Sequence, residues 1–178
     1  MDNYLQQIIQ LVLFVLPAYV ANSAPLVLGG GTAIDFGRKI SDGRRLFGKG
    51  KTIRGFVGGT AAGTLLGVFF SAAGIEFFGL SAGEKIALAF LLSFGALFGD
   101  LLGSFVKRRL GMAEGEPFFA IDQLLFLVVA LTLVYVYDPA VAAKVGVWGT
   151  AFLVLLTFAA HLFFNSLAHR LKLKKVPW

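Results

Sequence analysis

The chain has 178 residues and a formal net charge of +6; 57% of its residues are hydrophobic, 14% aromatic and only 15% charged. Soluble globular proteins carry about 25% charged residues, so this composition excludes a water-soluble domain or a disordered chain and predicts a protein embedded in lipid. The sequence contains no cysteine, which excludes a disulfide framework, a Cys-ligated zinc site and a thiol nucleophile.

Five apolar stretches are candidates for crossing a bilayer, because a spanning helix needs about 20 mainly apolar residues. They lie at 5–28, 56–73, 86–105, 118–137 and 145–167. We therefore predict an all-α, polytopic bundle of five transmembrane helices that forms a single integral-membrane domain over residues 1–178. The first stretch has the weakest pattern, since Pro17 interrupts it and Asn22 and Pro25 lie near its end.

Lysine and arginine are concentrated in three segments that an odd number of spans places on one side of the membrane. A loop at 29–55, a second loop at 106–120 and a tail at 168–178 hold 14 of the 16 cations. By the positive-inside rule this side is cytoplasmic, which puts the N-terminus outside and the C-terminus in the cytoplasm. At a membrane face, such charge favours anionic lipid or a phosphorylated substrate as partner, and not nucleic acid.

The 29–55 loop is rich in glycine and combines seven cations with two aspartates. Such a loop can wrap an anion with backbone amides and side chains, and we interpret it as a phosphate site. The alternative is a basic loop that fixes topology and contacts anionic lipid. Its candidate binding residues are Asp35, Asp42, Arg44, Arg45, Lys49, Lys51, Thr52 and Arg54, joined by Asn22 from the first span.

Asp100 is the most informative residue, because it lies inside an apolar span about 10 Å deeper than Lys107 at a helical rise of 1.5 Å. Ionisable groups at the bilayer centre cost about 2.5–3.5 kcal/mol on insertion scales and tend to mark function. On a helix Asp100 shares a face with Ser104 and Lys107. It is either half of an ion pair that holds helices together or a metal-binding carboxylate on a cytoplasm-facing cavity, and we favour the second.

Asp122 lies at the start of the fourth span. An aspartate there can accept hydrogen bonds from free backbone amides or take part in catalysis, and the sequence favours neither interpretation over the other. Glu114 and Glu116 are weaker candidates, because they can simply balance the neighbouring cations.

Two further patterns are interpreted as helix packing. The stripe of His161, Asn165 and His169 has too few ligands for a metal and predicts interhelical hydrogen bonds. Glycines in the second span give small faces that let helices approach closely. These glycines are Gly58, Gly59, Gly63 and Gly67.

Several of these motifs resemble a known enzyme family. The run Gly99-Asp100-Leu101, the run Ser104 to Arg108 and Ile121-Asp122-Gln123 are similar to the C-terminal signature of the phosphatidate cytidylyltransferases, membrane enzymes that use CTP. The resemblance to their archaeal relatives, the CDP-archaeol synthases, is closer and covers nearly the whole chain. It includes Asn22 with Pro25, Asp42 to Arg45, and Gly48 to Gly55.

The resemblance implies transfer of CMP from CTP to a digeranylgeranylglyceryl phosphate, giving CDP-archaeol and pyrophosphate with Mg²⁺ as cofactor. It implies that Asp100 and Asp122 hold the metal and that Lys107 and Arg108 are the catalytic cations that neutralise phosphate. The loop from Asp35 to Arg54 would close over CTP.

Two alternatives from other classes are weighed against this function. In a small transporter of an anionic substrate, Asp100 would couple ions, but no convincing inverted repeat appears and the basic loops lie on one side. A CDP-alcohol phosphotransferase also carries Asp-Gly, as at Asp42-Gly43, but the rest of that signature does not follow.

Overall fold

The computed structural model describes residues 2–170, which are helical apart from the connecting loops and two isolated antiparallel bridges. The helices are α1 (Asp2–Ser23), α2 (Pro25–Leu28), α3 (Ile53–Ala72), α4 (Ala82–Arg109), α5 (Phe119–Tyr137) and α6 (Pro139–Arg170). The predicted all-α class is confirmed for this part of the chain.

The helices follow the five predicted apolar stretches in order, with different bounds. Within the described residues, four are long and apolar enough to cross a membrane, namely α1 with α2, α3, α4 and α6, while α5 offers a shorter apolar stretch. Because α4 extends to Arg109, the loop predicted at 106–120 spans only 110–118, and the first loop ends at residue 52 instead of 55. Most of the predicted tail, 171–178, lies outside the described residues.

Local side-chain chemistry explains where the helices around the site begin and end. The Thr52 hydroxyl accepts a hydrogen bond from the Gly55 N–H at the start of α3, and Ser81 and Glu84 form a capping box at the start of α4. Three cations, Lys107 to Arg109, occupy the last turn of α4 and complement the negative end of the helix dipole.

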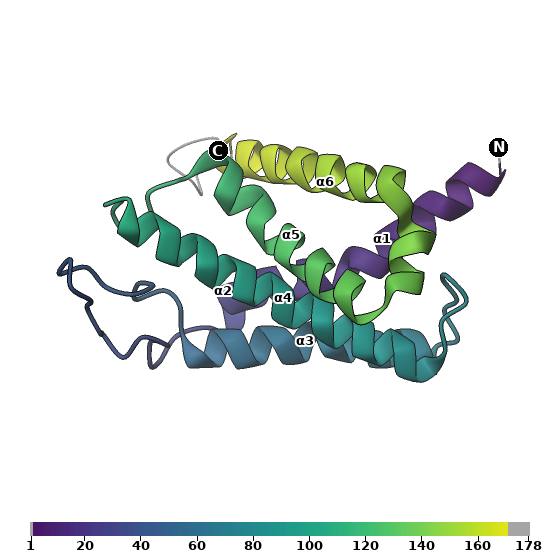
Figure 1. The fold of residues 1–178 in the computed structure, drawn as a ribbon, viewed down its shortest axis with the longest axis horizontal. Coiled ribbons are helices and arrows are strands. Elements are labelled where there is room, and N and C mark those ends of the chain that lie inside the picture. The colour runs from purple at the N-terminus through teal and green to yellow at the C-terminus, as the bar shows by residue number, and fades with distance from the viewer. Residues whose placement is uncertain (1, 171–178) are drawn as a thin grey trace.

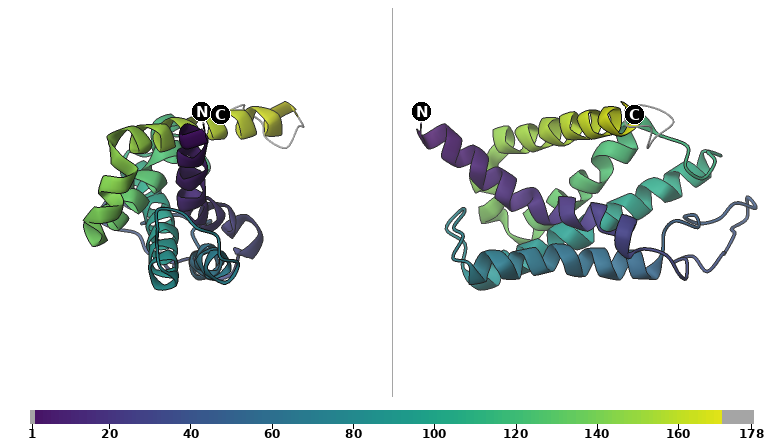
Figure 2. Two further views of the ribbon diagram at one scale, coloured as in Figure 1. Left: turned by 90° about the vertical axis from the view of Figure 1, so that its right-hand side faces the viewer. Right: turned by 180° about the vertical axis from the view of Figure 1, so that it is seen from behind.

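Helices α3 and α4 run side by side along the long axis, and α5 slants between α4 and α6 (Figure 1). The described start of α1 lies at the end of the molecule that holds the 73–81 turn. The loop 29–52 and the connection 110–118 lie together at the opposite end, as Figure 2 shows from behind. Two of the basic segments thus share one end of the bundle.

Close packing of α3 depends on glycine at every fourth residue, as predicted for a small-residue face. Of the predicted set, Gly59, Gly63 and Gly67 are buried, together with Gly55, whereas Gly58 is only half-buried and faces Leu28. A Cβ at Gly63 would lie 2.5 Å from the Pro17 carbonyl oxygen of α1 and 2.1 Å from Ser93 Oγ of α4. Three helices therefore meet at this point at a distance that only glycine permits.

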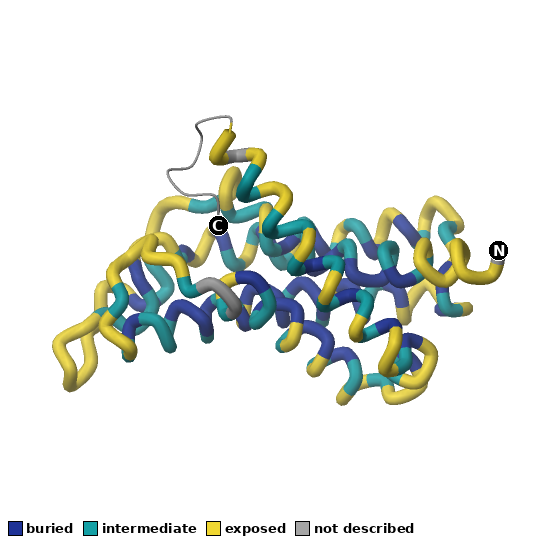
Figure 3. Tube along the Cα trace, turned by 90° about the horizontal axis from the view of Figure 1, so that it is seen from above, coloured by how far each residue is buried: buried dark blue, intermediate teal, exposed yellow. Residues whose placement is uncertain are grey.

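Burial is deepest where α1, α4 and α5 cross, whereas the loop 29–52 and much of α6 are exposed (Figure 3). Gly146 has φ 65° and breaks the helical path early in α6. Beyond it, α6 presents exposed apolar side chains. Lipid is the expected neighbour of such a surface in a membrane protein.

Candidate functional site

A cavity of about 920 Å³ opens between the helices and the two loops of the basic end. Its charged lining comes from Lys51, Asp100, Lys107, Glu116 and Asp122. The remaining lining is largely apolar or aromatic and includes Leu26, Phe56, Leu97, Leu101, Phe126 and Phe164. Leu97 and Phe126 lie about one helical turn further from the loops than Asp100 and Asp122, so the cavity is amphipathic.

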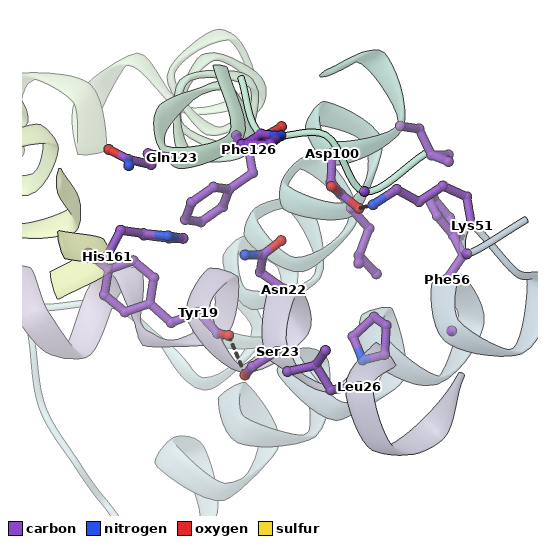
Figure 4. Close-up of a pocket in the computed structure, with 18 of the residues that line it drawn as sticks. Tyr19, Asn22, Ser23, Leu26, Lys51, Phe56, Asp100, Gln123, Phe126 and His161 are labelled. Atoms are coloured by element: carbon purple, nitrogen blue, oxygen red, sulfur yellow. Dashed lines mark hydrogen bonds and ion pairs between the residues drawn. The ribbon is translucent and has the colours of Figure 1, made fainter. Parts of the chain in front are cut away.

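The first of two ion pairs on the cavity joins the glycine-rich loop to α4. Lys51 Nζ lies 2.5 Å from Asp100 Oδ2, and both side chains remain about one-third exposed, at 30% and 37%. Figure 4 shows the two side chains pointing toward each other. Asp100 therefore lines a cavity and also pairs with a lysine, so its contacts fit both interpretations of the sequence, and its role as a metal ligand stays a prediction.

The second pair joins α4 to α5. Lys107 Nζ lies 2.7 Å from Asp122 Oδ1, and the Asp122 side chain is 37% exposed. Asp122 Oδ2 also accepts a hydrogen bond of 2.9 Å from the Phe118 N–H. Asp122 therefore satisfies a free amide at the helix start, as the first interpretation expected, and it also lines the cavity, while its catalytic role stays a prediction.

Asp35 organises the glycine-rich loop from inside. Its carboxylate is buried and accepts hydrogen bonds from the Arg45 guanidinium and from the backbone N–H groups of Gly37, Phe47 and Gly48. Burial alone would raise the pKa of Asp35, but Arg45 and the three amides lower it well below its ordinary range. With all these donors engaged, Asp35 shapes the loop instead of lining the cavity.

A second set of contacts fixes this loop onto the end of α4. Arg109 Nη1 lies 2.7 Å from Asp42 Oδ2, and Arg44 donates to the carbonyl oxygens of Arg108 and Arg109. Gly111 adopts φ 83° beneath Arg44, where a Cβ would lie 2.9 Å from the guanidinium. The loop is thereby held over the same helix end that carries Lys107.

The structure brings together six of the predicted site residues and separates the rest. Within the described chain, the cavity is lined by Asn22, Lys51, Thr52, Asp100, Lys107 and Asp122. The residues that do not line it are Asp35, Asp42, Arg44, Arg45, Lys49, Arg54 and Arg108. Ser104, predicted to share a face with Asp100, is buried away from the cavity.

Arg108 is buried beside the cavity and not on it. Its Nη2 donates to the Ala113 carbonyl oxygen at 2.9 Å, and its Nε has no hydrogen-bond partner among the described residues. Arg108 therefore supports the 110–118 connection, and its role in neutralising phosphate, which the resemblance implies, stays a prediction.

Sequence reasoning missed several cavity residues within the spans. Gln123 is buried, lines the cavity, and its Oε1 has no partner within the described chain. The Tyr19 hydroxyl lies 2.6 Å from Thr157 Oγ1 and links α1 to α6 across the lining. His161, interpreted as packing, lies beside Phe126 with ring centroids 5.7 Å apart (Figure 4). Uncharged polar residues in apolar spans were the available signal.

The oxygen donors of the cavity suit a magnesium ion that arrives with a phosphate ligand. Among the described residues, no three acidic or histidine side chains cluster closely enough to hold a metal by themselves. Mg²⁺ usually binds through one or two carboxylates together with substrate phosphates and water. Asp100 and Asp122 on one cavity match that donor set.

Replacing Asp35 by asparagine is expected to loosen the loop, because Arg45 would lose its anionic partner in a buried position. Trypsin should then cleave within 29–52 several-fold faster in detergent. The pKa of Asp35 is lowered in the fold, so its contribution is complete above the unfolded pKa of about 4 and is lost as the pH falls through the lowered value. The assay at pH 7 therefore reports the full effect. Asp138→Asn is the control, because Asp138 lies outside the loop at the start of α6, where asparagine caps a helix as well as aspartate does, and equal cleavage rates would contradict this role.

Comparison with known proteins gives consistent likenesses. Residues 4–178 match the sequence model of a family described as "CarS-like: CDP-archaeol synthase". A CDP-archaeol synthase of Pyrococcus horikoshii is 47% identical over 98% of this chain and 99% of its own. One from Archaeoglobus fulgidus is 43% identical over 98% and 99%. A solved structure described as "Structural insight into an intramembrane enzyme for archaeal membrane lipids biosynthesis" has a TM-score of 0.67 and 38% identity, covering 85% of this chain and 92% of that one.

Proposed function

The chain belongs to the CDP-archaeol synthase family, and from this premise we propose that it transfers CMP from CTP to an archaeal lipid phosphate, the digeranylgeranylglyceryl phosphate. The products are CDP-archaeol and pyrophosphate, and the enzyme acts in membrane lipid biosynthesis. The observation that carries the proposal is the amphipathic cavity, in which two lysine–aspartate pairs face the same space as an apolar lining.

The reaction joins two anions, so its main barrier is repulsion between phosphates. A lipid phosphate oxygen attacks the α-phosphorus of CTP, and the bond from that phosphorus to the bridging β-phosphate oxygen breaks, releasing pyrophosphate. A phosphate monoester is already largely ionised at neutral pH, since its second pKa is about 6. The nucleophile therefore needs no strong general base, and the site needs fixed positive charge.

The cavity side chains can meet that need. Lys51 and Lys107 each lie next to an aspartate. Their ammonium groups can therefore bind phosphates beside these two acids. Mg²⁺ held by Asp100 and Asp122 would supply further charge neutralisation at the reacting phosphates. Arg108 holds the 110–118 connection and Arg109 holds the 29–52 loop at the same end of α4. The apolar lining accommodates the lipid next to its phosphate.

We also propose that the cavity faces the cytoplasm, where CTP is available. The two described basic segments lie at the same end of the bundle as the cavity, which supports this orientation through the positive-inside rule.

The test is an assay of purified protein in detergent with α-labelled CTP, the lipid phosphate and Mg²⁺. Label should appear in a lipid product together with an equal amount of pyrophosphate. A preparation that binds CTP and lipid but forms neither product would contradict the transfer reaction.

Gln123→Leu should separate function from packing at the buried amide. Because Oε1 has no partner in the structure, the variant is expected to unfold at an equal or higher temperature. Loss of a hydrogen bond to substrate, worth about 0.5–1.5 kcal/mol, should reduce kcat/KM by about two- to tenfold. Gln10→Leu, in the N-terminal half of α1 and outside the cavity lining, is the control for kcat/KM. Unchanged kcat/KM for Gln123→Leu would assign the residue to packing.

A further inference from the structure

We propose that Lys51 and Lys107 keep the cation site closed until the nucleotide arrives. Each ammonium occupies the carboxylate that would bind Mg²⁺, and the phosphates of the nucleotide draw the ammonium away. This inference rests on the proposed function and adds to it an order of events, in which the metal and the nucleotide bind together while the free metal binds weakly.

The two pairs have the geometry that such an exchange requires. The N···O distances of 2.5 and 2.7 Å put an ammonium directly on each carboxylate. Each aspartate is nonetheless 37% exposed, on a cavity that both pairs line. A ligand in the cavity therefore reaches both members of each pair without opening the bundle.

A free cation has little to gain at this site. It would have to displace an ammonium, and the other acid on the lining, Glu116, already accepts a hydrogen bond of 2.7 Å from the Ala113 N–H through Oε2. The displaced lysine would lose its anionic partner, and the cost is largest for Lys107, whose side chain is only 13% exposed. The lysines thus compete with metal for the same oxygens.

A nucleoside triphosphate changes the competition between lysine and metal for each carboxylate, because its phosphates are new partners for both lysines. Each carboxylate is then released to the cation that the phosphates carry. By thermodynamic linkage, the nucleotide must strengthen metal binding by the same factor as the metal strengthens nucleotide binding.

The exchange needs only side-chain movement. The backbone around Lys51 is fixed by the hydrogen bond from the Ile34 N–H to the Lys51 carbonyl oxygen and by the Thr52 cap of α3. Lys107 lies within α4. Long lysine side chains can therefore swing from carboxylate to phosphate while the loop and the helix stay in place.

The proposal is tested by measuring two affinities, for Mn²⁺ and for CTP, which it expects to change in opposite directions. Mn²⁺ binding to the nucleotide-free protein in detergent is followed by electron paramagnetic resonance, and labelled CTP binding is measured at saturating Mn²⁺ without lipid. Lys51→Met should bind Mn²⁺ about fivefold or more tightly than the unaltered protein, since the competing ammonium is gone. It should bind CTP about tenfold or more weakly, since a charge-assisted hydrogen bond to phosphate is lost.

Lys107→Met tests the second pair in the same way and serves if Lys51→Met does not fold. Lys144→Met is the matched control, because Lys144 donates to the Phe78 carbonyl oxygen at the other end of the bundle, and it should change neither affinity. Merely structural lysines would weaken both ligands together. Unchanged or weaker Mn²⁺ binding in both cavity variants would overturn the proposal.

Turnover of the unaltered protein on the same preparation distinguishes this inference from the proposed function. A preparation that makes CDP-lipid but shows no tighter Mn²⁺ binding in the lysine variants overturns the exchange alone. Opposite affinity changes without any product would support the exchange and contradict the transfer reaction.

Discussion

Asp100→Asn and Asp122→Asn are each expected to lower kcat by about 10³-fold, because a lost carboxylate removes several kcal/mol of charge stabilisation at the reacting phosphates. Asparagine keeps the size of the side chain and removes the negative charge that a magnesium ion requires. Both residues line the same cavity from different helices, so both substitutions act on one site. The measurement is initial-rate formation of labelled CDP-lipid in detergent.

Each substitution also breaks an ion pair, and a control must separate that effect from loss of a metal ligand. Glu76→Gln is suitable, because Glu76 Oε1 lies 2.7 Å from Lys85 Nζ, outside the cavity lining. It should leave kcat within about twofold because the pair lies outside the cavity, although the buried Lys85 loses its carboxylate partner and the unfolding temperature should fall. Unfolding temperatures show whether each variant is folded. Near-normal rates in both aspartate variants would exclude them as metal ligands.

The architecture was predictable because its signals are local. Runs of apolar residues require helices in lipid, so hydropathy alone located five helical segments in the right order. Their ends were less accurate, since α4 continues through three cations to Arg109. That extension depends on the favourable interaction of cations with a helix C-terminus, which a hydropathy count treats as a loop.

The charged part of the site was predictable only as a group. Depth in the membrane identified Asp100, because a carboxylate inside an apolar span is energetically costly and tends to mark function. Composition could not say which loop residues reach the cavity. Lys51 faces it, whereas Arg45 turns inward to the buried Asp35. That division is made by backbone turns and by contacts between residues distant in sequence, which no spacing rule encodes.

The uncharged part of the site was missed for a different reason. Tyr19, Phe126 and Thr157 have the composition of ordinary transmembrane packing and become lining only because α1, α5 and α6 leave a cavity between them. Gln123 was the exception that could have been found, since an amide inside an apolar span needs a partner in lipid.

Gly63→Ala is expected to destabilise the bundle by about 1–3 kcal/mol, the usual effect of overpacking a tight core. The added methyl group would meet the Pro17 carbonyl oxygen at 2.5 Å and Ser93 Oγ at 2.1 Å. The Ser93 hydroxyl can rotate away, but the Pro17 carbonyl oxygen and Ser93 Cβ, at 2.9 Å, cannot, so α1 and α4 have to shift from α3. Thermal unfolding in detergent measures the effect as a lower midpoint.

Gly83→Ala is the matched control, because a Cβ at this helical glycine of α4 would meet nothing within 4 Å. Alanine gains up to about 1 kcal/mol of helix propensity in a helix interior, as at Gly63, and less in the first turn of α4, as at Gly83. The difference between the two midpoints is therefore a lower bound on the packing cost where α1, α3 and α4 meet. Since α1 carries Asn22 and α4 carries Asp100, the same shift should move two cavity walls apart and lower the affinity for CTP. Equal midpoints would show that α1, α3 and α4 do not approach closely enough at residue 63 to require glycine there.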